Sequence, residues 1–136
     1  MDIGLLLITH NNIGQQLLDV ASETLGVCPL KTHVLAVNFD AKPDALKKQA
    51  HDMLKSLDRG SGVLVLTDIY GSTPSNIADS LADLDTVRVV SGVNLPMLIR
   101  TLNYANLSLD EIAEKAITGG HDGIIDYQVI TRIDAA

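Results

Sequence analysis

The chain has 136 residues, 46% of them hydrophobic and 20% charged, and its formal net charge is −7. This length and composition are typical of a globular protein with one full core, so we expect a single domain over residues 1–136. The acidic balance excludes sequence-independent binding of nucleic acid, which requires a basic surface, and favours other proteins as partners.

The sequence also indicates the compartment and the type of site. Its single cysteine, Cys28, cannot form an internal disulfide, which favours a reducing compartment. No basic segment precedes the first apolar run, and no apolar run approaches about 20 residues. We therefore expect no signal peptide, no membrane span and a cytoplasmic location. No pair of histidines or cysteines has the spacing of a zinc site, and we expect no metal and no cofactor.

Apolar runs alternate with helical patterns along the whole chain. The first run covers residues 4–9 without polar alternation, as in a strand that is buried on both faces. Similar runs predict further strands over 32–39, 62–68 and 86–90. Apolar residues at helical spacing predict helices over 13–25, 43–57, 74–84, 95–102 and 109–117. This alternation predicts an α/β fold, an open doubly wound sheet of four parallel strands in the order 2-1-3-4 flanked by helices.

Local signals predict where some helices begin and end. Asn11 or Asn12 is the natural N-cap of the first helix, and Thr73 is the expected N-cap of the third. Gly119 and Gly120 are expected to end the last helix, because glycine is common just after a helix.

Two titratable residues follow strands that this order makes neighbours. His10 comes after the first strand and Asp68 after the third, so both face the crevice where open α/β sheets bind ligands. An aspartate can hold one imidazole nitrogen as an N–H donor and leave the other as a nucleophile. Backbone N–H groups at the helix starts after Asn12 and Thr73 favour an anion in the same crevice. These groups together suit phosphoryl transfer through a phosphohistidine.

Other interpretations of these residues stay open. A histidine or an aspartate at the end of a strand is often purely structural. A receiver-like signalling domain would use Asp68 as the phosphate acceptor, but it needs further carboxylates where this chain has Thr9 and His10. A hydrolase triad of Ser72, His10 and Asp68 is conceivable, but the chain has no Gly-x-Ser-x-Gly elbow.

Three segments in the right order and spacing resemble a known family, the IIA domain of the mannose-family sugar phosphotransferase system (PTS). They are the run Gly4 to Thr9 with His10, the run Val63 to Asp68 with Gly71-Ser72-Thr73-Pro74-Ser75-Asn76, and Ser91-Gly92-Val93-Asn94-Leu95-Pro96-Met97-Leu98. The last segment is a distinctive signature of the family. The resemblance covers nearly the whole chain.

The resemblance implies specific roles for the site residues. The family's phosphorylated histidine falls on His10, the aspartate that orients its ring on Asp68, and the phosphate-facing loop on Gly71, Ser72 and Thr73. The phosphocarrier protein HPr would donate the phosphate, and a IIB protein would receive it for sugar uptake. Two positions depart from the family pattern. The family often has a second glycine where this chain has Ser72, which restricts the loop backbone, and a tryptophan is common at the position of the tyrosine that precedes Gly71.

The resemblance also predicts how the chain assembles. Residues 124–133 alternate partly between apolar and polar side chains, which predicts a half-exposed C-terminal strand. The family implies that this strand crosses to a neighbouring subunit and pairs antiparallel in a homodimer. The IIB component is expected on a separate chain, and the membrane is expected to be involved only through a transporter complex. A regulatory IIA protein that signals through its phosphorylation state, without a transporter, is the alternative.

Overall fold

The computed structural model describes residues 2–128, and its elements alternate as the sequence predicts. The elements are β1 (Gly4–His10), α1 (Ile13–Leu25), β2 (Thr32–Val37), α2 (Pro43–Leu57), β3 (Val63–Thr67), α3 (Thr73–Asp79), β4 (Val87–Ser91), α4 (Leu95–Asn103) and α5 (Leu109–Asp122). All strand pairs are parallel, and the strands lie in the order β2-β1-β3-β4. The predicted fold and strand order are confirmed.

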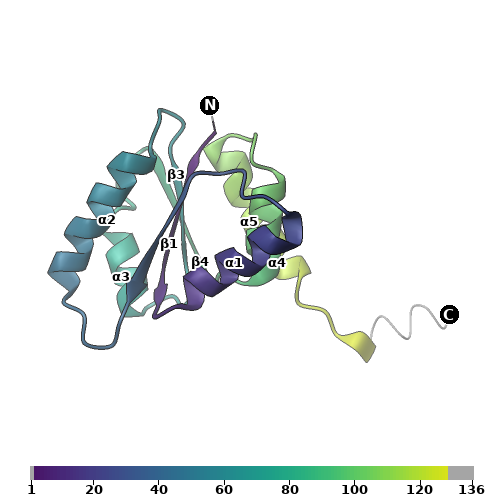
Figure 1. Cartoon of the computed structure of the whole chain (residues 1–136), viewed down its shortest axis with the longest axis horizontal. Helices are drawn as coiled ribbons and strands as arrows, with labels where there is room; N and C mark the ends of the chain where they lie inside the picture. Colours follow the sequence, from purple (N-terminus) through teal and green to yellow (C-terminus); the bar gives the residue numbers. More distant parts are fainter. Residues whose placement is uncertain (1, 129–136) are drawn as a thin grey trace.

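The sheet separates two helical layers, with α2 and α3 on one face and α1, α4 and α5 on the other (Figure 1). Side chains of β1 enter both layers in turn, because successive residues of a strand point to opposite faces. Leu5 and Leu7 pack on the α1, α4 and α5 side, whereas Leu6 and Ile8 pack on the α2 and α3 side. All four are fully buried, and each such side chain contributes about 1.5–3 kcal/mol of hydrophobic stabilisation. Burial on both faces explains the unbroken apolar run.

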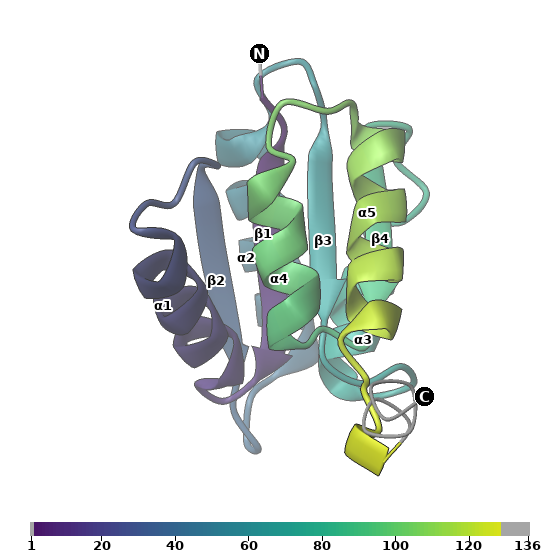
Figure 2. The same ribbon diagram turned by 90° about the vertical axis from the view of Figure 1, so that its right-hand side faces the viewer.

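The end predicted for the last helix is wrong. Gly119 and Gly120 lie inside α5, which continues to Asp122. A Cβ atom on Gly119 would lie 2.7 Å from the Cβ of Arg100, and one on Gly120 would lie 2.9 Å from the Cε of Met97. The two glycines therefore allow α5 to pack closely against α4, where Figure 2 shows the helices side by side. Tertiary packing, rather than helix termination, accounts for this pair.

The third helix also differs from its prediction. Ser72 occupies the N-cap position, and Thr73 is the first helical residue. The helix ends at Asp79, and its continuation towards Leu84 consists of turns. At the first helix Asn12 is the N-cap, as one of the two predicted positions, but its side chain makes no capping hydrogen bond.

The predicted C-terminal strand lies mostly outside the described residues. Residues 124–126 have no regular secondary structure, and they extend away from the helical layers (Figure 1). Ile124, Ile125 and Tyr127 expose their side chains. Among residues 2–128, no helix combines the length and the apolar character that a membrane span requires.

Candidate active site at the carboxyl end of the sheet

His10 is the last residue of β1, and two hydrogen bonds join it to Asp68. The backbone N–H of His10 donates to Asp68 Oδ2 at 2.9 Å, and the ring Nδ1 lies 2.9 Å from the same oxygen. The His10 side chain is 41% exposed, whereas that of Asp68 is 9% exposed. The structure thus brings together the two residues that the sequence placed at neighbouring strand ends, with the imidazole at the surface and the carboxylate beneath it.

The contact determines which ring nitrogen is free. An ionised carboxylate can only accept hydrogen bonds, so the nitrogen facing it, Nδ1, carries the proton. The other nitrogen, Nε2, then keeps its lone pair as a potential nucleophile. Asp68 Oδ1 also accepts a hydrogen bond from the backbone N–H of Ile69 at 3.1 Å. The carboxylate therefore has a fixed orientation.

The surroundings of Asp68 favour its charged form. Burial opposes ionisation and is the largest single influence on this carboxyl group. The hydrogen bonds from the His10 backbone and ring, the charge of the His10 ring and a backbone hydrogen bond at Asp68 itself together outweigh burial, so the pKa of Asp68 lies below its ordinary value. Asp68 is thus ionised at neutral pH and remains an acceptor for the ring.

The turn between β1 and α1 is fixed by contacts on either side of His10. Thr9 is fully buried, and its Oγ1 accepts a hydrogen bond from the backbone N–H of Gly14 at 2.8 Å. A Cβ atom on Gly14 would lie 2.7 Å from that oxygen, so this approach requires glycine. Asn11 adopts a left-handed conformation with φ of 45°, and its N–H donates to the carbonyl of Val37 at 3.1 Å. The main chain at His10 is therefore held from both sides.

A cavity of about 460 Å³ opens beside the imidazole. The predicted loop residues Gly71, Ser72 and Thr73 line it together with His10 and Asn76. Its other wall is the segment between β2 and α2, which contributes Val37, Asn38, Phe39, Ala41 and Pro43. The structure thus places all the predicted site residues around one cavity, except Asp68, which lies behind the ring.

The serine in this loop causes no backbone strain. Ser72 has φ of −97° and ψ of 175°, an extended conformation that any residue adopts, whereas Gly71 has a positive φ of 84°. The Ser72 hydroxyl donates to the carbonyl of Ile69 at 2.6 Å, and the Gly71 N–H donates to the Ser75 hydroxyl at 3.2 Å. These bonds close the loop on itself. The expected restriction at Ser72 is therefore compatible with the loop geometry.

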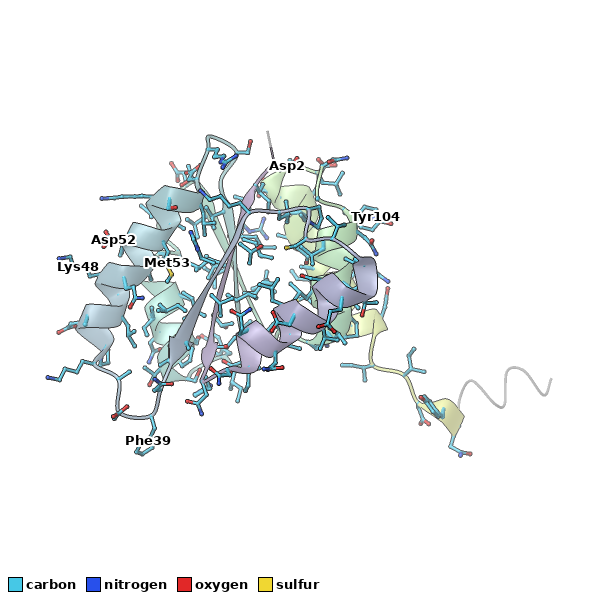
Figure 3. The ribbon with its side chains drawn as sticks, in the orientation of Figure 1. Asp2, Phe39, Lys48, Asp52, Met53 and Tyr104 are labelled. Atoms are coloured by element: carbon cyan, nitrogen blue, oxygen red, sulfur yellow. The ribbon has the colours of Figure 1, made fainter. Side chains whose placement is uncertain are left out.

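The sequence interpretation gave no site role to six residues that line this cavity, Val37, Asn38, Phe39, Ala41, Pro43 and Asn76. Phe39 was assigned to the end of the second strand, but β2 ends at Val37, and Phe39 is fully exposed at the tip of the following loop (Figure 3). Asn76 lies in the helix after the loop and gave no separate signal. The available hint of a loop at Phe39 was that Asn38 and Asp40 flank it and Pro43 follows four residues later.

The signature segment after β4 has a structural position. Asn94 Oδ1 accepts a hydrogen bond from the N–H of Met97 at 2.9 Å and so caps α4, and its Nδ2 donates to the carbonyl of Gly120 at 3.1 Å. Val93 N–H donates to the carbonyl of Thr67 at 2.9 Å. The segment therefore ties the end of β3 to α4 and α5, and it does not line the His10 cavity.

The geometry disfavours the competing types of site. Asp68 already accepts hydrogen bonds at both carboxylate oxygens, so it is poorly placed to attack phosphorus as a receiver aspartate. The hydroxyl of Ser72 donates to Ile69 rather than to His10, so a hydrolase triad is not assembled. Within residues 2–128, no three His, Cys, Asp or Glu side chains are grouped to hold a metal ion.

Comparison with known proteins identifies the family. Residues 4–117 match the family described as PTS system fructose IIA component. The chain is 32% identical over 129 residues to the PTS system mannose-specific EIIAB component of Escherichia coli strain K12, covering 91% of this chain and 39% of that protein. The chain therefore spans less than half the length of this relative.

Solved structures share the fold. The phosphotransferase system component EIIA from Streptococcus agalactiae has a TM-score of 0.82 and 23% identity, and the match covers 93% of this chain and 98% of that one. The mannose/sorbose specific IIA subunit from Enterococcus faecalis also has a TM-score of 0.82 and 23% identity, covering 93% and 95%. With the family match over most of its length, the chain belongs to the mannose-family IIA components of the sugar phosphotransferase system.

Proposed function

We propose that His10 carries the phosphoryl group in this phosphotransferase component, receiving it from phospho-HPr and passing it to a IIB protein in sugar uptake. The observation that carries the proposal is the 2.9 Å contact of His10 Nδ1 with Asp68 Oδ2, which leaves Nε2 free. The exposed position of the ring supports it, because a second protein must reach the nitrogen. A cytoplasmic location, where a soluble donor is available, belongs to the same proposal.

The phosphoryl transfer that we propose needs neither a metal ion nor a proton donor. The lone pair of His10 Nε2 attacks phosphorus, the Nε2–P bond forms, and the N–P bond of the donor phosphohistidine breaks. The donor ring, which is a phosphorylated imidazolium before transfer, leaves as neutral imidazole, and the His10 ring becomes the phosphorylated imidazolium. Asp68 stabilises this cation through the Nδ1–H bond that it already accepts. The same steps in reverse order transfer the group to an imidazole of the next acceptor.

Gly71, Ser72 and Thr73 are assigned to the phosphoryl group because they line the cavity that adjoins the ring. Backbone N–H groups in the first turn of a helix have no intrahelical acceptor and suit an anion. The Ser72 hydroxyl is engaged with Ile69 and the Gly71 N–H with Ser75, which leaves the backbone N–H groups of Ser72 and Thr73 and the Thr73 hydroxyl as the donors of this loop.

The stability of the phosphorylated residue distinguishes the candidate sites. A phosphoramidate on histidine survives alkali and is lost in acid, an acyl phosphate on aspartate is lost in alkali, and a phosphoserine survives acid. We expect wild-type protein incubated with phosphoenolpyruvate, enzyme I and HPr to acquire acid-labile, alkali-stable label. His10→Ala should acquire none, and His33→Ala, on the β2 strand away from the cavity, should label normally. Label retained by His10→Ala, or no label in wild type beside a labelled IIA control, would refute the proposal.

We also propose a homodimer that the tail helps to form. The exposed apolar side chains of Ile124, Ile125 and Tyr127 support it, because apolar side chains on a segment leaving the body are stabilised by burial against another chain. Among residues 2–128, β4 is an edge strand of the sheet, which is the natural place for a further strand to pair. We expect truncation after Gly123 to give monomer or insoluble protein. A dimer of unchanged mass by light scattering would contradict this assembly.

A further inference from the structure

Two asparagine residues border the His10 cavity from opposite sides. Because β1 lies between β2 and β3, the loops that follow these two strands flank the imidazole at the end of β1. Asn38 belongs to the first loop and precedes Phe39, which marks the tip of that loop in Figure 3. Asn76 lies in α3, which follows the second loop. Both asparagines line the cavity, and neither has a role in the fold or the site so far.

The backbone places both residues close to the imidazole. Val37 is the partner of His10 in the β1–β2 pair, and Asn38 follows it directly. Adjacent strands lie about 5 Å apart, so the main chain of Asn38 begins beside that of His10. On the other wall, Asn76 comes three residues after Thr73 in α3, and residues at this spacing share one face of a helix. Asn76 therefore lies on the same side of α3 as the loop residues assigned to the phosphoryl group.

The carboxamide groups of both residues are free to bind a ligand. Their main chains are hydrogen-bonded, because the carbonyl of Asn38 accepts from the N–H of Ala41 at 3.1 Å and the N–H of Asn76 donates to the carbonyl of Ser72 at 2.9 Å. Their side chains form no hydrogen bond with any residue of the described range 2–128. Both residues are exposed, so water satisfies the amide groups and a ligand oxygen can replace it.

The cavity offers few other donors to an anion. No lysine or arginine is present among the described residues that line it, and Lys42 lies between two lining residues without being one itself. On the wall formed by the β2–α2 segment, Asn38 is the one described lining residue whose side chain can donate a hydrogen bond, because the others there are apolar. A carboxamide NH2 group offers two N–H donors without a net charge. The two asparagines thus extend the donor set of the β3 loop across the cavity.

We infer that Asn38 and Asn76 donate hydrogen bonds from their carboxamide N–H groups to oxygens of the phosphoryl group on His10, one from each wall of the cavity. The inference rests on the proposed function of His10. Neutral donors suit a group that is passed on, because a lysine or arginine in contact with the anion would bind it more strongly and retain it.

The equilibrium constant for transfer from phospho-HPr to this chain tests the inference. A residue that only helps the donor protein to dock changes the forward and reverse rates together and leaves this constant unchanged, whereas a residue that binds the phosphoryl group in the product changes it. We expect Asn38→Ala and Asn76→Ala each to lower the constant on the order of tenfold, because each removes a hydrogen bond to a charged group. Asn103→Ala, at an equally exposed residue of α4 outside the cavity, should match wild type.

Aspartate variants distinguish binding from mere proximity. Asn38→Asp and Asn76→Asp keep the size of the side chain but replace the NH2 donor with a charged acceptor oxygen, so they should lower the constant further than the alanine variants do. If the aspartate variants lower the constant and the alanine variants leave it unchanged, the side chains lie near the phosphoryl group without binding it, and the inference is wrong. All these positions are exposed, and the two cavity side chains are unbonded, so folding is preserved.

Nuclear magnetic resonance gives a readout that does not depend on transfer rates. The side-chain NH2 signals of Asn38 and Asn76 should shift when wild type is phosphorylated, because their hydrogen-bond acceptor changes from water to a phosphoryl oxygen. The NH2 signals of Asn103 should not shift. Unmoved signals of Asn38 and Asn76 in fully phosphorylated protein would overturn the inference.

The outcomes separate this inference from the proposed function. If wild type is labelled on His10 but the alanine variants at Asn38 and Asn76 have its equilibrium constant, the inference alone is wrong. If Lys42→Ala lowers the constant and the asparagine variants do not, a cation binds the phosphoryl group instead, and the inference is also overturned. If wild type takes no label on His10, the proposed function is wrong and the inference falls with it.

Discussion

The loops that follow β3 and β4 have nearly the same local design but different tasks. Each contains a glycine with positive φ, 84° at Gly71 and 89° at Gly92. Each then has an extended residue at the N-cap position, Ser72 before α3 and Asn94 before α4, and a proline in the first helical turn. The β3 loop borders the His10 cavity, whereas the β4 loop makes hydrogen bonds to both α4 and α5.

The difference lies in where the cap side chains bond. Asn94 caps its own helix and also donates to the carbonyl of Gly120, so both its polar ends are used inside the fold. The Ser72 hydroxyl instead donates back to Ile69, and no side-chain capping bond is made to α3. In the first turn of α3, Pro74 has no N–H and the Asn76 N–H donates to the carbonyl of Ser72, so the N–H groups of Thr73 and Ser75 are the ones that the Ser72 side chain leaves uncapped. The same backbone plan thus occurs in a loop that packs helices together and in a loop that borders the His10 cavity.

The comparison predicts that substitutions near the β3 loop change phosphate uptake while leaving the fold intact. Asp68→Ala should slow uptake from phospho-HPr by on the order of 10²-fold or more, because the ring loses the group that holds its tautomer and position. Uptake is measured by rapid quench, and circular dichroism checks the fold. Asp68→Asn, which can still accept at one oxygen, should lose less. Unchanged uptake in Asp68→Ala would mean that the pairing has no functional role.

Substitutions in the β4 loop should have the opposite effect. Asn94→Ala should lower the free energy of unfolding by about 1–3 kcal/mol, because it removes a helix cap and leaves the Gly120 carbonyl without this donor. Uptake per folded molecule should stay near wild type. Asn94→Asp keeps the cap acceptor but loses the bond to Gly120, so its loss in urea unfolding should be smaller. Equal losses in the two variants would contradict this division of roles.

Acid should weaken the contact beneath His10. The pKa of Asp68 is lowered in the folded protein, so its ionised form stabilises the fold above the unfolded-state pKa of about 3.9. This contribution is lost as the pH falls through the lower, folded-state pKa. The difference in unfolding free energy between wild type and Asp68→Asn should therefore shrink from pH 6 towards pH 2. A difference that grows on acidification would reverse the sign of the proposed linkage.

The smallest effect is expected at Ser72. Ser72→Gly removes the hydroxyl that donates to the carbonyl of Ile69, but glycine can adopt the extended backbone conformation of this position. The free energy of unfolding should therefore change by only a few tenths of a kcal/mol to about 1 kcal/mol. Uptake should stay within about threefold of wild type, because main-chain groups line the cavity in either case. A loss of uptake comparable to that of Asp68→Ala would show that the serine itself is needed.

The sequence predicted the features that depend on local pattern and on strand order. Burial of β1 on both faces produced the apolar run, and the order of parallel strands brought His10 beside Asp68. The capping box of α5 is likewise a local feature, because Ser108 and Glu111 are three residues apart, and both reciprocal bonds are present. These features follow from residues that are close in sequence or from the short connections of parallel strands.

The features that the sequence did not predict depend on contacts that form only in the folded structure. Gly119 resembled a helix terminator, and only the approach of Arg100 from another helix shows why it lies inside α5. The bond from Gly14 to Thr9 had no sequence signal, because a threonine and a glycine five residues apart are common. Phe39 completed an apolar run, and its exposure follows from where β2 leaves β1.

The two hydrogen bonds between His10 and Asp68 have a consequence for the order in which a donor and an acceptor bind. Asp68 Oδ2 accepts hydrogen bonds from both the backbone N–H and the ring of His10. These bonds fix the ring, so it does not move between two distant binding sites. If His10 carries phosphate, donor and acceptor have to approach the same fixed atom in turn. Each then excludes the other, and the exchange is a relay in which one protein leaves before the next arrives.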